Sequence, residues 1–124
     1  MKGRIYGISE IRTILDAEIL TGETEAELSQ KEIGGAFGCD LMSDVLAFVN
    51  NQSLLLTGLI NSQVIRTAEM MDITCVCFVR GKIPPEDVIA LAKEKDITLL
   101  TTKKTLYNAS GMLYEKGLGG VSDD

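Results

Sequence analysis

Thr, Gly, Arg and Lys residues follow three apolar segments in the second half of the chain. They are Thr57-Gly58, Arg80-Gly81 and the run TTKK at 101–104. Hydroxyl, guanidinium and ammonium groups bind phosphate oxygens well. If the three segments are parallel strands, these residues lie together at the carboxyl edge of one sheet, where open α/β sheets bind ligands. We predict a site for a small anionic or nucleotide-type ligand made of Thr57, Asn61, Arg80, Gly81, Thr101, Thr102 and Lys103. The alternative is that they are turn residues and a solvated lysine.

The segment at 34–44 (GGAFGCDLMSD) has the most unusual local composition of the chain. Gly34 and Gly35 permit a close approach of backbone to ligand, so we place them beside the predicted site. A structural explanation is equally available, in which the glycines form a turn or bulge and Asp40 caps a helix. Both interpretations stay open at this point.

The residue inventory excludes several catalytic classes. There is no histidine, so the commonest general base and metal ligand is missing. The glycine-rich signatures of P-loop kinases and of dinucleotide-binding folds are also missing. An enzyme would have to depend on Asp40, Asp44 or Lys103, and a cap and a solvated acid explain the two aspartates as well. We predict a non-catalytic protein without a cofactor.

Three cysteines are present, and two of them alternate along an apolar segment. Cys75 and Cys77 would point to the same face of a strand, where a soft metal site with Cys39 is conceivable. Strong metal signals use differently spaced pairs. We therefore predict that the cysteines are small buried hydrophobes and that no metal is bound. The odd number of thiols favours reduced cysteines and a cytoplasmic location.

The composition of the chain limits its domain number and its possible partners. The 124 residues are 45% hydrophobic and 24% charged, with a formal net charge of −6. These values fit one globular domain over 1–124, and the negative charge argues against a nucleic-acid partner. No signal peptide or membrane-spanning segment is expected. A homodimer is expected because symmetric dimers are common.

The second half alternates between strand and helix patterns. Strands are predicted at 53–57, 73–79 and 97–100, and their centres Leu55, Val76 and Leu99 are 21 and 23 residues apart. Helices are predicted after Asn61, after Pro84-Pro85 and over about 105–116, with Gly117 as the stop. Strands joined through helices run parallel with right-handed crossovers. The predicted fold is α/β, a three-layer sandwich with a mainly parallel sheet flanked by helices.

The first half is less regular. We predict a short helix capped by Ser9, a strand and turn at 18–22, a polar loop at 23–27 and an extended segment at 28–37. A helix capped by Asp40 should follow, with Leu41, Val45, Phe48 and Val49 at helical spacing. We expect an ordered core over about 3–117 and a frayed tail at 118–124.

The run GGAFGCDLMSDVLA at 34–47 resembles the DRTGG domain family. The segments at 54–58 (LLLTG), 68–70 (AEM), 78–81 (FVRG) and 99–102 (LLTT) continue the similarity in order, over about residues 3–117. The resemblance implies a fold like the N-terminal domain of HPr kinase/phosphorylase and of a Mur ligase. It also implies a non-catalytic module, since members occur beside CBS domains in regulated pyrophosphatases, where they help to dimerise. Stand-alone versions are similar to proteins encoded near iron-only hydrogenases.

The sequence departs from the family's namesake residues. The expected Asp-Arg is replaced by the stretch Leu59-Ile60-Asn61-Ser62, and the expected Thr-Gly-Gly reads Val79-Arg80-Gly81. If these residues are structural, Asn61 and Gly81 can serve as turn residues in the same way. The leading prediction is thus a regulatory, homodimeric module that senses a nucleotide or another phosphate-bearing molecule. The alternative is a ligand-free dimerisation or protein-interaction module, linked to hydrogenase or redox metabolism.

Overall fold

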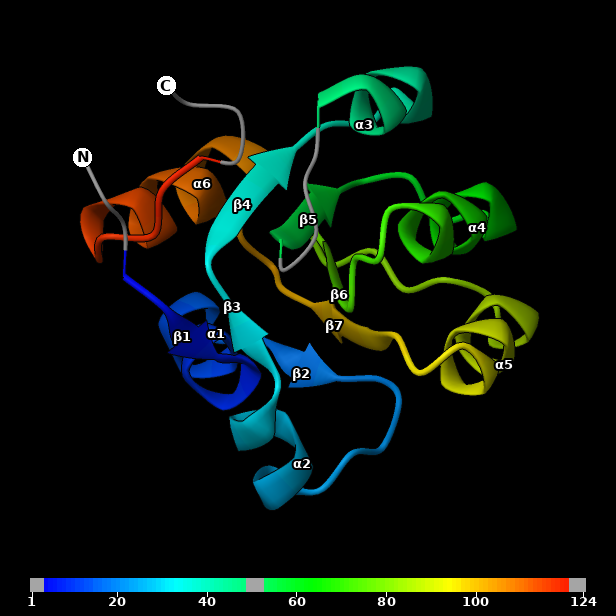
Figure 1. Cartoon of the computed structure of the whole chain (residues 1–124), viewed down its shortest axis with the longest axis horizontal. Helices are drawn as coiled ribbons and strands as arrows, with labels where there is room; N and C mark the ends of the chain where they lie inside the picture. Colours follow the sequence, from blue (N-terminus) through cyan, green and yellow to red (C-terminus); the bar gives the residue numbers. More distant parts are fainter. Residues whose placement is uncertain (1–3, 49–52, 121–124) are drawn as a thin grey trace.

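A five-stranded sheet forms the centre of the molecule in a computed structural model, which describes residues 4–48 and 53–120. The strand order is β2-β7-β6-β5-β4 (Figure 1). Strands β4 to β7 are parallel, and β2 pairs antiparallel with β7. The bounds are β2 Glu18–Ile19, β4 Gly35–Gly38, β5 Ser53–Thr57, β6 Cys75–Phe78 and β7 Thr98–Thr101. The three strands predicted in the second half and their parallel arrangement are confirmed.

Helices cover both faces of this sheet, as the three-layer prediction requires. One face packs against α1 and α6 and the other against α3, α4 and α5 (Figure 1). Each crossover helix begins close to the residue that the sequence indicates; Asn61 and Thr105 accept hydrogen bonds from the first-turn N–H groups of Gln63 and Asn108. The bounds are α1 Ile8–Leu15, α3 Met42–Phe48, α4 Ser62–Met70, α5 Glu86–Glu94 and α6 Leu106–Glu115.

The strand register divides the core into two apolar layers. Leu55, Val76 and Leu99 are neighbours across β5, β6 and β7 and face α3, α4 and α5. Cys75 and Cys77 point to the opposite face, among the side chains of α1 and α6. Both thiols are fully buried, which confirms the prediction that these two cysteines share one face and behave as small apolar groups.

Two elements of the N-terminal third differ from the prediction. Helix α1 begins at Ile8 with Gly7 as its cap, because the Gly7 N–H binds Glu10 and a buried Ile8 starts the apolar face. Ser9 is therefore not the cap, and its hydroxyl lies 3.1 Å from that of Ser29.

The predicted polar loop at 23–27 is instead the start of helix α2 (Glu25–Gln30). Thr24 and Glu27 form a reciprocal capping box, with hydrogen bonds of 3.2 and 2.8 Å. The helix also includes the first residues of the extended segment predicted at 28–37, so that the extended backbone starts only after residue 30. A small antiparallel sheet of β1 (Tyr6–Gly7) and β3 (Glu32–Ile33) then holds α1 and α2 together.

Residues 118–120 are not frayed, contrary to the prediction. Leu118 is buried, the Ala36 N–H donates to the Gly119 carbonyl at 3.0 Å, and Gly120 forms a parallel bridge with Ala36. The rest of the predicted tail, 121–124, and the predicted helix residue Val49 lie outside the described residues. None of the helices in residues 4–48 and 53–120 combines the length and apolar character that a bilayer crossing requires.

Candidate functional site

The loops that follow β6 and β7 are joined by backbone hydrogen bonds at the carboxyl edge of the sheet. Arg80 N donates to the Lys104 carbonyl and Gly81 N to the Thr102 carbonyl, both at 2.8 Å. Thr101 Oγ1 donates to the Lys82 carbonyl at 2.7 Å. The residues predicted after these two strands therefore form one contiguous surface.

Arg80 occupies a backbone conformation that L-residues seldom adopt. Its φ is 59° and that of Gly81 is 69°, so both central residues of this turn are left-handed. Gly81 is free to adopt such an angle, whereas a residue with a side chain is strained by roughly 1–2 kcal/mol. The other described non-glycine residues with positive φ are Asp16, Asp72 and Asp96, and Asp tolerates the conformation better. Arg80 is the unusual member of this group.

Asp40 connects the ends of β4 and β5. Its Oδ1 accepts hydrogen bonds from the Thr57 hydroxyl and the Gly58 N–H, each 2.8 Å long. Asp40 is not the predicted helix cap, because α3 begins two residues later at Met42 and the Leu41 carbonyl accepts the first helical hydrogen bonds.

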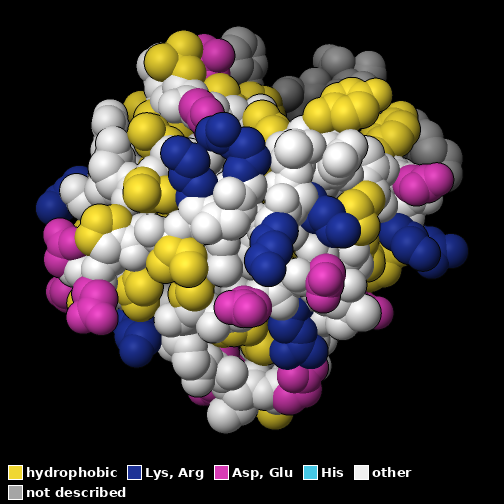
Figure 2. Space-filling view, turned by 180° about the vertical axis from the view of Figure 1, so that it is seen from behind, with side chains coloured by type: hydrophobic (Ala, Val, Ile, Leu, Met, Phe, Trp, Pro, Cys, Tyr) yellow, Lys and Arg dark blue, Asp and Glu magenta, His cyan; other side chains and the backbone are white. Residues whose placement is uncertain are grey.

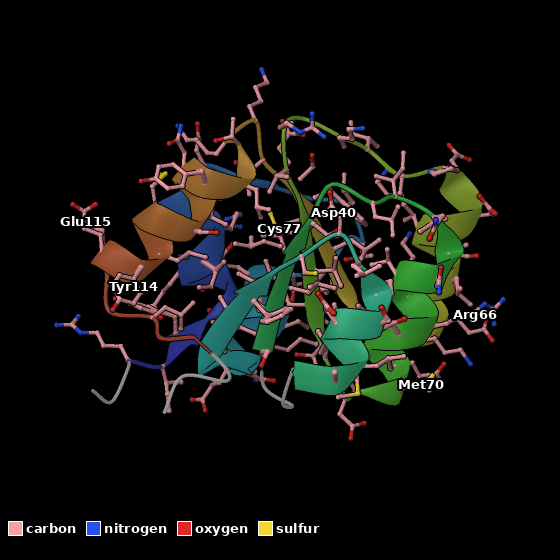
Figure 3. The ribbon with its side chains drawn as sticks, turned by 90° about the horizontal axis from the view of Figure 1, so that it is seen from above. Asp40, Arg66, Met70, Cys77, Tyr114 and Glu115 are labelled. Atoms are coloured by element: carbon pink, nitrogen blue, oxygen red, sulfur yellow. The ribbon has the colours of Figure 1, made fainter. Side chains whose placement is uncertain are left out.

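The surroundings of Asp40 favour its ionised form. The Gly58 hydrogen bond, the Thr57 hydrogen bond and the charges of Arg80 and Lys82 together lower the pKa of Asp40, and they outweigh the opposing effect of partial burial. Asp40 is therefore an anion at neutral pH and a poor proton donor. Figure 3 labels it just beyond the end of β4.

Arg80 lies beside Gly58 and Asp40. A Cβ on Gly58 would stand 3.3 Å from Arg80 Nη2 and 3.6 Å from Asp40 Oδ2. On the other side of the turn, a Cβ on Gly81 would stand 3.9 Å from Lys103 Cγ. The Arg80 guanidinium thus lies beside the loop after β5, and the next residue of the turn, Gly81, lies beside Lys103.

Four cationic side chains gather on this edge, contributed by Arg80, Lys82, Lys103 and Lys104. Among the described residues none of the four forms an ion pair within 4.0 Å or a side-chain hydrogen bond. The loops after β6 and β7 lie at the rear of the view in Figure 1, and Figure 2 shows Lys and Arg side chains near the centre of that face. A chain of net charge −6 therefore carries a local excess of positive charge here.

Four of the predicted polar ligands have structural partners, and the first is Thr57, whose hydroxyl donates to Asp40. Thr102 is buried and donates to the Leu15 carbonyl at 2.7 Å, at the end of α1. The Thr101 hydroxyl donates to the Lys82 carbonyl, and the Asn61 side chain accepts the Gln63 N–H at the start of α4. These residues position the loops that carry the cations.

Gly34 and Gly35 do not lie beside the predicted site. Gly35 is the first residue of β4 and pairs with Ser53, the first residue of β5, so both glycines are at the amino edge of the sheet. The correct neighbours of the site on this strand are the residues that follow its carboxyl end, Cys39 and Asp40. The glycine run forms the strand itself, because an edge strand packed under a helix needs small residues: a Cβ on Gly38 would lie 3.0 Å from Leu106 Cδ1.

The buried cysteines cannot supply a reactive thiolate at neutral pH. Burial raises the pKa of Cys77 to about 12 and that of Cys75 well above its ordinary value. Cys39 is only half-buried, and its sulfur accepts the Leu41 N–H at 3.2 Å. Within the part of the chain that the structure describes, no three Cys, Asp or Glu side chains group so that they could hold a metal ion.

An open groove between β4 and α6 was not anticipated from the sequence. Its volume is about 910 Å³, and Lys104, Tyr107, Gly111 and Tyr114 contribute to its walls. The sequence assigned the Leu106, Ala109 and Leu113 face of α6 to the core, and Ala109 and Leu113 are indeed buried. The sequence feature that could have indicated the groove is the pair Tyr107 and Tyr114, which are seven residues apart and lie away from the core face of the helix.

The chain is an α/β domain with a mainly parallel sheet, and the carboxyl edge of that sheet carries a cluster of cations. The DRTGG domain family profile matches residues 10–115, and the chain belongs to this family. No curated protein sequence matches the chain.

The structure is also similar to the crystal structure of the CBS and DRTGG domains of the regulatory region of Clostridium perfringens pyrophosphatase, which was solved with its activator, diadenosine tetraphosphate. The TM-score is 0.73 and the sequences are 18% identical, over 91% of this chain and 48% of the other. This likeness shows the fold alone, and the chain spans about half the length of that structure.

Proposed function

We propose that this chain is a non-catalytic regulatory module that binds a small phosphate-bearing anion at the carboxyl edge of its sheet. The four unpaired cations on one edge carry the proposal. Ion pairs would explain these cations structurally, but in the described chain Arg80, Lys82, Lys103 and Lys104 form none within 4.0 Å, and Asp40, which lies near Arg80 and Lys82, is a single negative charge beside four positive ones. Phosphate oxygens are the natural partners of such a group.

The backbone of Arg80 adds a second argument. A glycine at φ 59° would carry no strain, so the arginine side chain is retained at a cost to folding. Strained residues of this kind concentrate at functional sites. Arg80 is accordingly the principal anion ligand of the proposal, with Lys103 beside it across Gly81.

The related structure supports the regulatory and nucleotide parts of the proposal. It is described as a regulatory region in complex with an activator, and that activator is a dinucleoside polyphosphate. The same fold therefore occurs within a nucleotide-responsive assembly, and a phosphate-rich ligand is consistent with the cations of this chain.

Calorimetric titration with tripolyphosphate tests the proposal, because this probe carries charge without any base. We expect a defined isotherm for the unmodified protein and at least tenfold weaker binding for Arg80→Gly, since glycine keeps the turn and removes the guanidinium. Glycine would destabilise helix α4 through its greater backbone entropy, so Arg66→Ala is the control; it deletes an exposed cation elsewhere and should bind normally. The absence of binding by the unmodified protein, or equal binding by Arg80→Gly, would overturn the proposal.

A second candidate function is a homodimerisation or protein-interaction module without a ligand. The observation that favours it is the exposure of large apolar side chains, including Met70 at 70%, Ile83 at 58% and Leu41 at 58%. Sedimentation equilibrium distinguishes the two. A dimer that forms equally well in Arg80→Gly and without added anion would support this second function, and a monomer at every concentration would remove its dimerisation form.

A further inference from the structure

Helix α6 presents two tyrosines to the groove along β4. Tyr107 is 86% exposed and Tyr114 is 71% exposed, so neither ring is packed into the core. They are seven residues apart, about two helical turns, so they project from nearly the same side of the helix. Figure 3 labels Tyr114 and Glu115 at the end of α6 that is farther from the cationic loops.

Gly111 lies between the tyrosines on the same side of the helix, four residues after Tyr107 and three before Tyr114. Its backbone is helical, and a Cβ built on it meets nothing within 4 Å. Alanine would fit this position and is the better helix former, so neither conformation nor packing explains the glycine. Gly111 thus leaves an open space on the helix surface between Tyr107 and Tyr114, which we call the slot.

The groove opens onto the cationic edge. Lys104 lines the groove and also belongs to the loop whose carbonyl accepts the Arg80 N–H. Gly38, at the carboxyl end of β4, lines it from the sheet. The opposite end of the groove is lined by Glu115, so within the groove lining the Lys104 end is the one that favours phosphate groups.

We propose that the slot between Tyr107 and Tyr114 takes the aromatic base of a nucleotide whose phosphates lie on Lys104 and the neighbouring cations. This inference rests on the proposed function and specifies its ligand class. Tyrosine rings bind bases by stacking, and the strength of stacking depends little on which base is bound because every base has a π-face. Because Lys104 lines one end of the groove and Glu115 the other, a nucleotide is favoured over a neutral aromatic compound, and its phosphates are expected at the Lys104 end.

The experiment compares ATP with tripolyphosphate by calorimetry, without divalent metal. If the slot holds the base, ATP binds the unmodified protein on the order of tenfold or more tightly than tripolyphosphate. Gly111→Leu fills the slot and Tyr107→Ala removes one ring, so each should abolish this difference and leave tripolyphosphate binding intact. Tyr107→Phe should retain the difference, and Ala90→Leu on an exposed position of α5 is the control for adding a leucine to a helix.

Proton NMR gives a direct readout, because the chain has no Trp or His and only three tyrosines. ATP, but not tripolyphosphate, should shift the ring protons of Tyr107 and Tyr114. Tyr6 is the internal control, since its hydroxyl is bound to the Lys116 carbonyl outside the groove.

The outcomes separate the two proposals. Equal affinity for ATP and tripolyphosphate, or an ATP advantage that persists in Gly111→Leu, overturns the base site and leaves the anion site standing. Binding of neither probe overturns both. An ATP advantage lost in Gly111→Leu and Tyr107→Ala, together with the tyrosine shifts, supports the base site.

Discussion

Asp40 Oδ1 lies 2.8 Å from the Thr57 hydroxyl and joins the carboxyl ends of two neighbouring strands, β4 and β5. The same oxygen accepts the Gly58 N–H, which begins the loop beside Arg80. The carboxylate thus holds the loop that faces the cationic edge and counters part of its charge.

Removing this carboxylate should lower the stability of the fold. We expect Asp40→Ala to reduce the free energy of unfolding by about 1–2 kcal/mol, because two donors lose a charged acceptor that is partly exposed to solvent. Urea unfolding measures the loss. Asp44→Ala, in the first turn of α3, is the control and should cost about 0.5 kcal/mol or less. Equal losses for the two variants would contradict the role of Asp40.

The contribution of Asp40 should depend on pH in a defined direction. Its pKa is lowered in the folded chain, so the folded state binds this proton less tightly than the unfolded state does. The stabilisation is therefore fully present above the unfolded pKa and is lost as the pH falls through the folded value. The difference in unfolding free energy between the unmodified protein and Asp40→Asn should shrink between about pH 5 and pH 3. A difference that stays constant over this range would refute the assignment.

The strain at Arg80 predicts a stabilising substitution. Arg80→Gly should raise the free energy of unfolding by about 0.5–1 kcal/mol, because relief of the left-handed strain exceeds the added entropy of glycine in the unfolded chain. Arg80→Ala removes the same charge and keeps the strain, so it should gain little or nothing. Thermal unfolding of the two variants side by side measures the backbone effect, and identical midpoints would show that no strain is present.

Thr102 should act as a structural residue. Its buried hydroxyl donates to the Leu15 carbonyl, so Thr102→Val leaves that carbonyl without a partner and should cost about 1–3 kcal/mol of stability. Thr13→Val is the matched control, since that exposed hydroxyl donates within its own helix to the Ser9 carbonyl. If Thr102→Val kept full stability and lost anion binding, the hydroxyl would be a ligand group after all.

The thiols should react in two classes. In the native protein at about pH 8, a thiol reagent should modify Cys39 rapidly, while Cys75 and Cys77 react only as the protein unfolds, because burial raises their pKa values. Cys39→Ser should abolish the rapid phase. Rapid reaction of more than one thiol would show that the core opens readily.

The layered fold followed from the sequence because its central strands are apolar on both faces and its helices carry clear caps. Leu55, Val76 and Leu99, chosen as strand centres, are direct neighbours in the sheet. Helix α2 was missed although Thr24 and Glu27 have the spacing of a capping box. That local signal was available and was outweighed by the polar composition of the segment.

The site was harder to predict, because its partners are distant in the chain. Arg80, Gly81 and Lys103 were placed together correctly, since parallel strands bring their carboxyl ends to one edge. Asp40 has the residue type of a cap, and only the tertiary fold shows that its partners are Thr57 and Gly58. Gly34 and Gly35 were placed at the wrong edge because the start of β4 could not be read from a glycine run.

The hydrogen bonds from Arg80 N and Gly81 N to the 102–104 loop have a consequence for selectivity. Because both N–H groups of the turn donate within the fold, they are not available to bind the oxygens of a phosphate. An anion at this edge is therefore bound by long side chains, whose charged ends can adapt to anions of many shapes. Immobilising each side chain costs about 0.5–1.5 kcal/mol of binding free energy. We expect the edge by itself to rank polyanions by charge, so that discrimination between molecules of equal charge has to come from contacts outside it, such as those in the groove along α6.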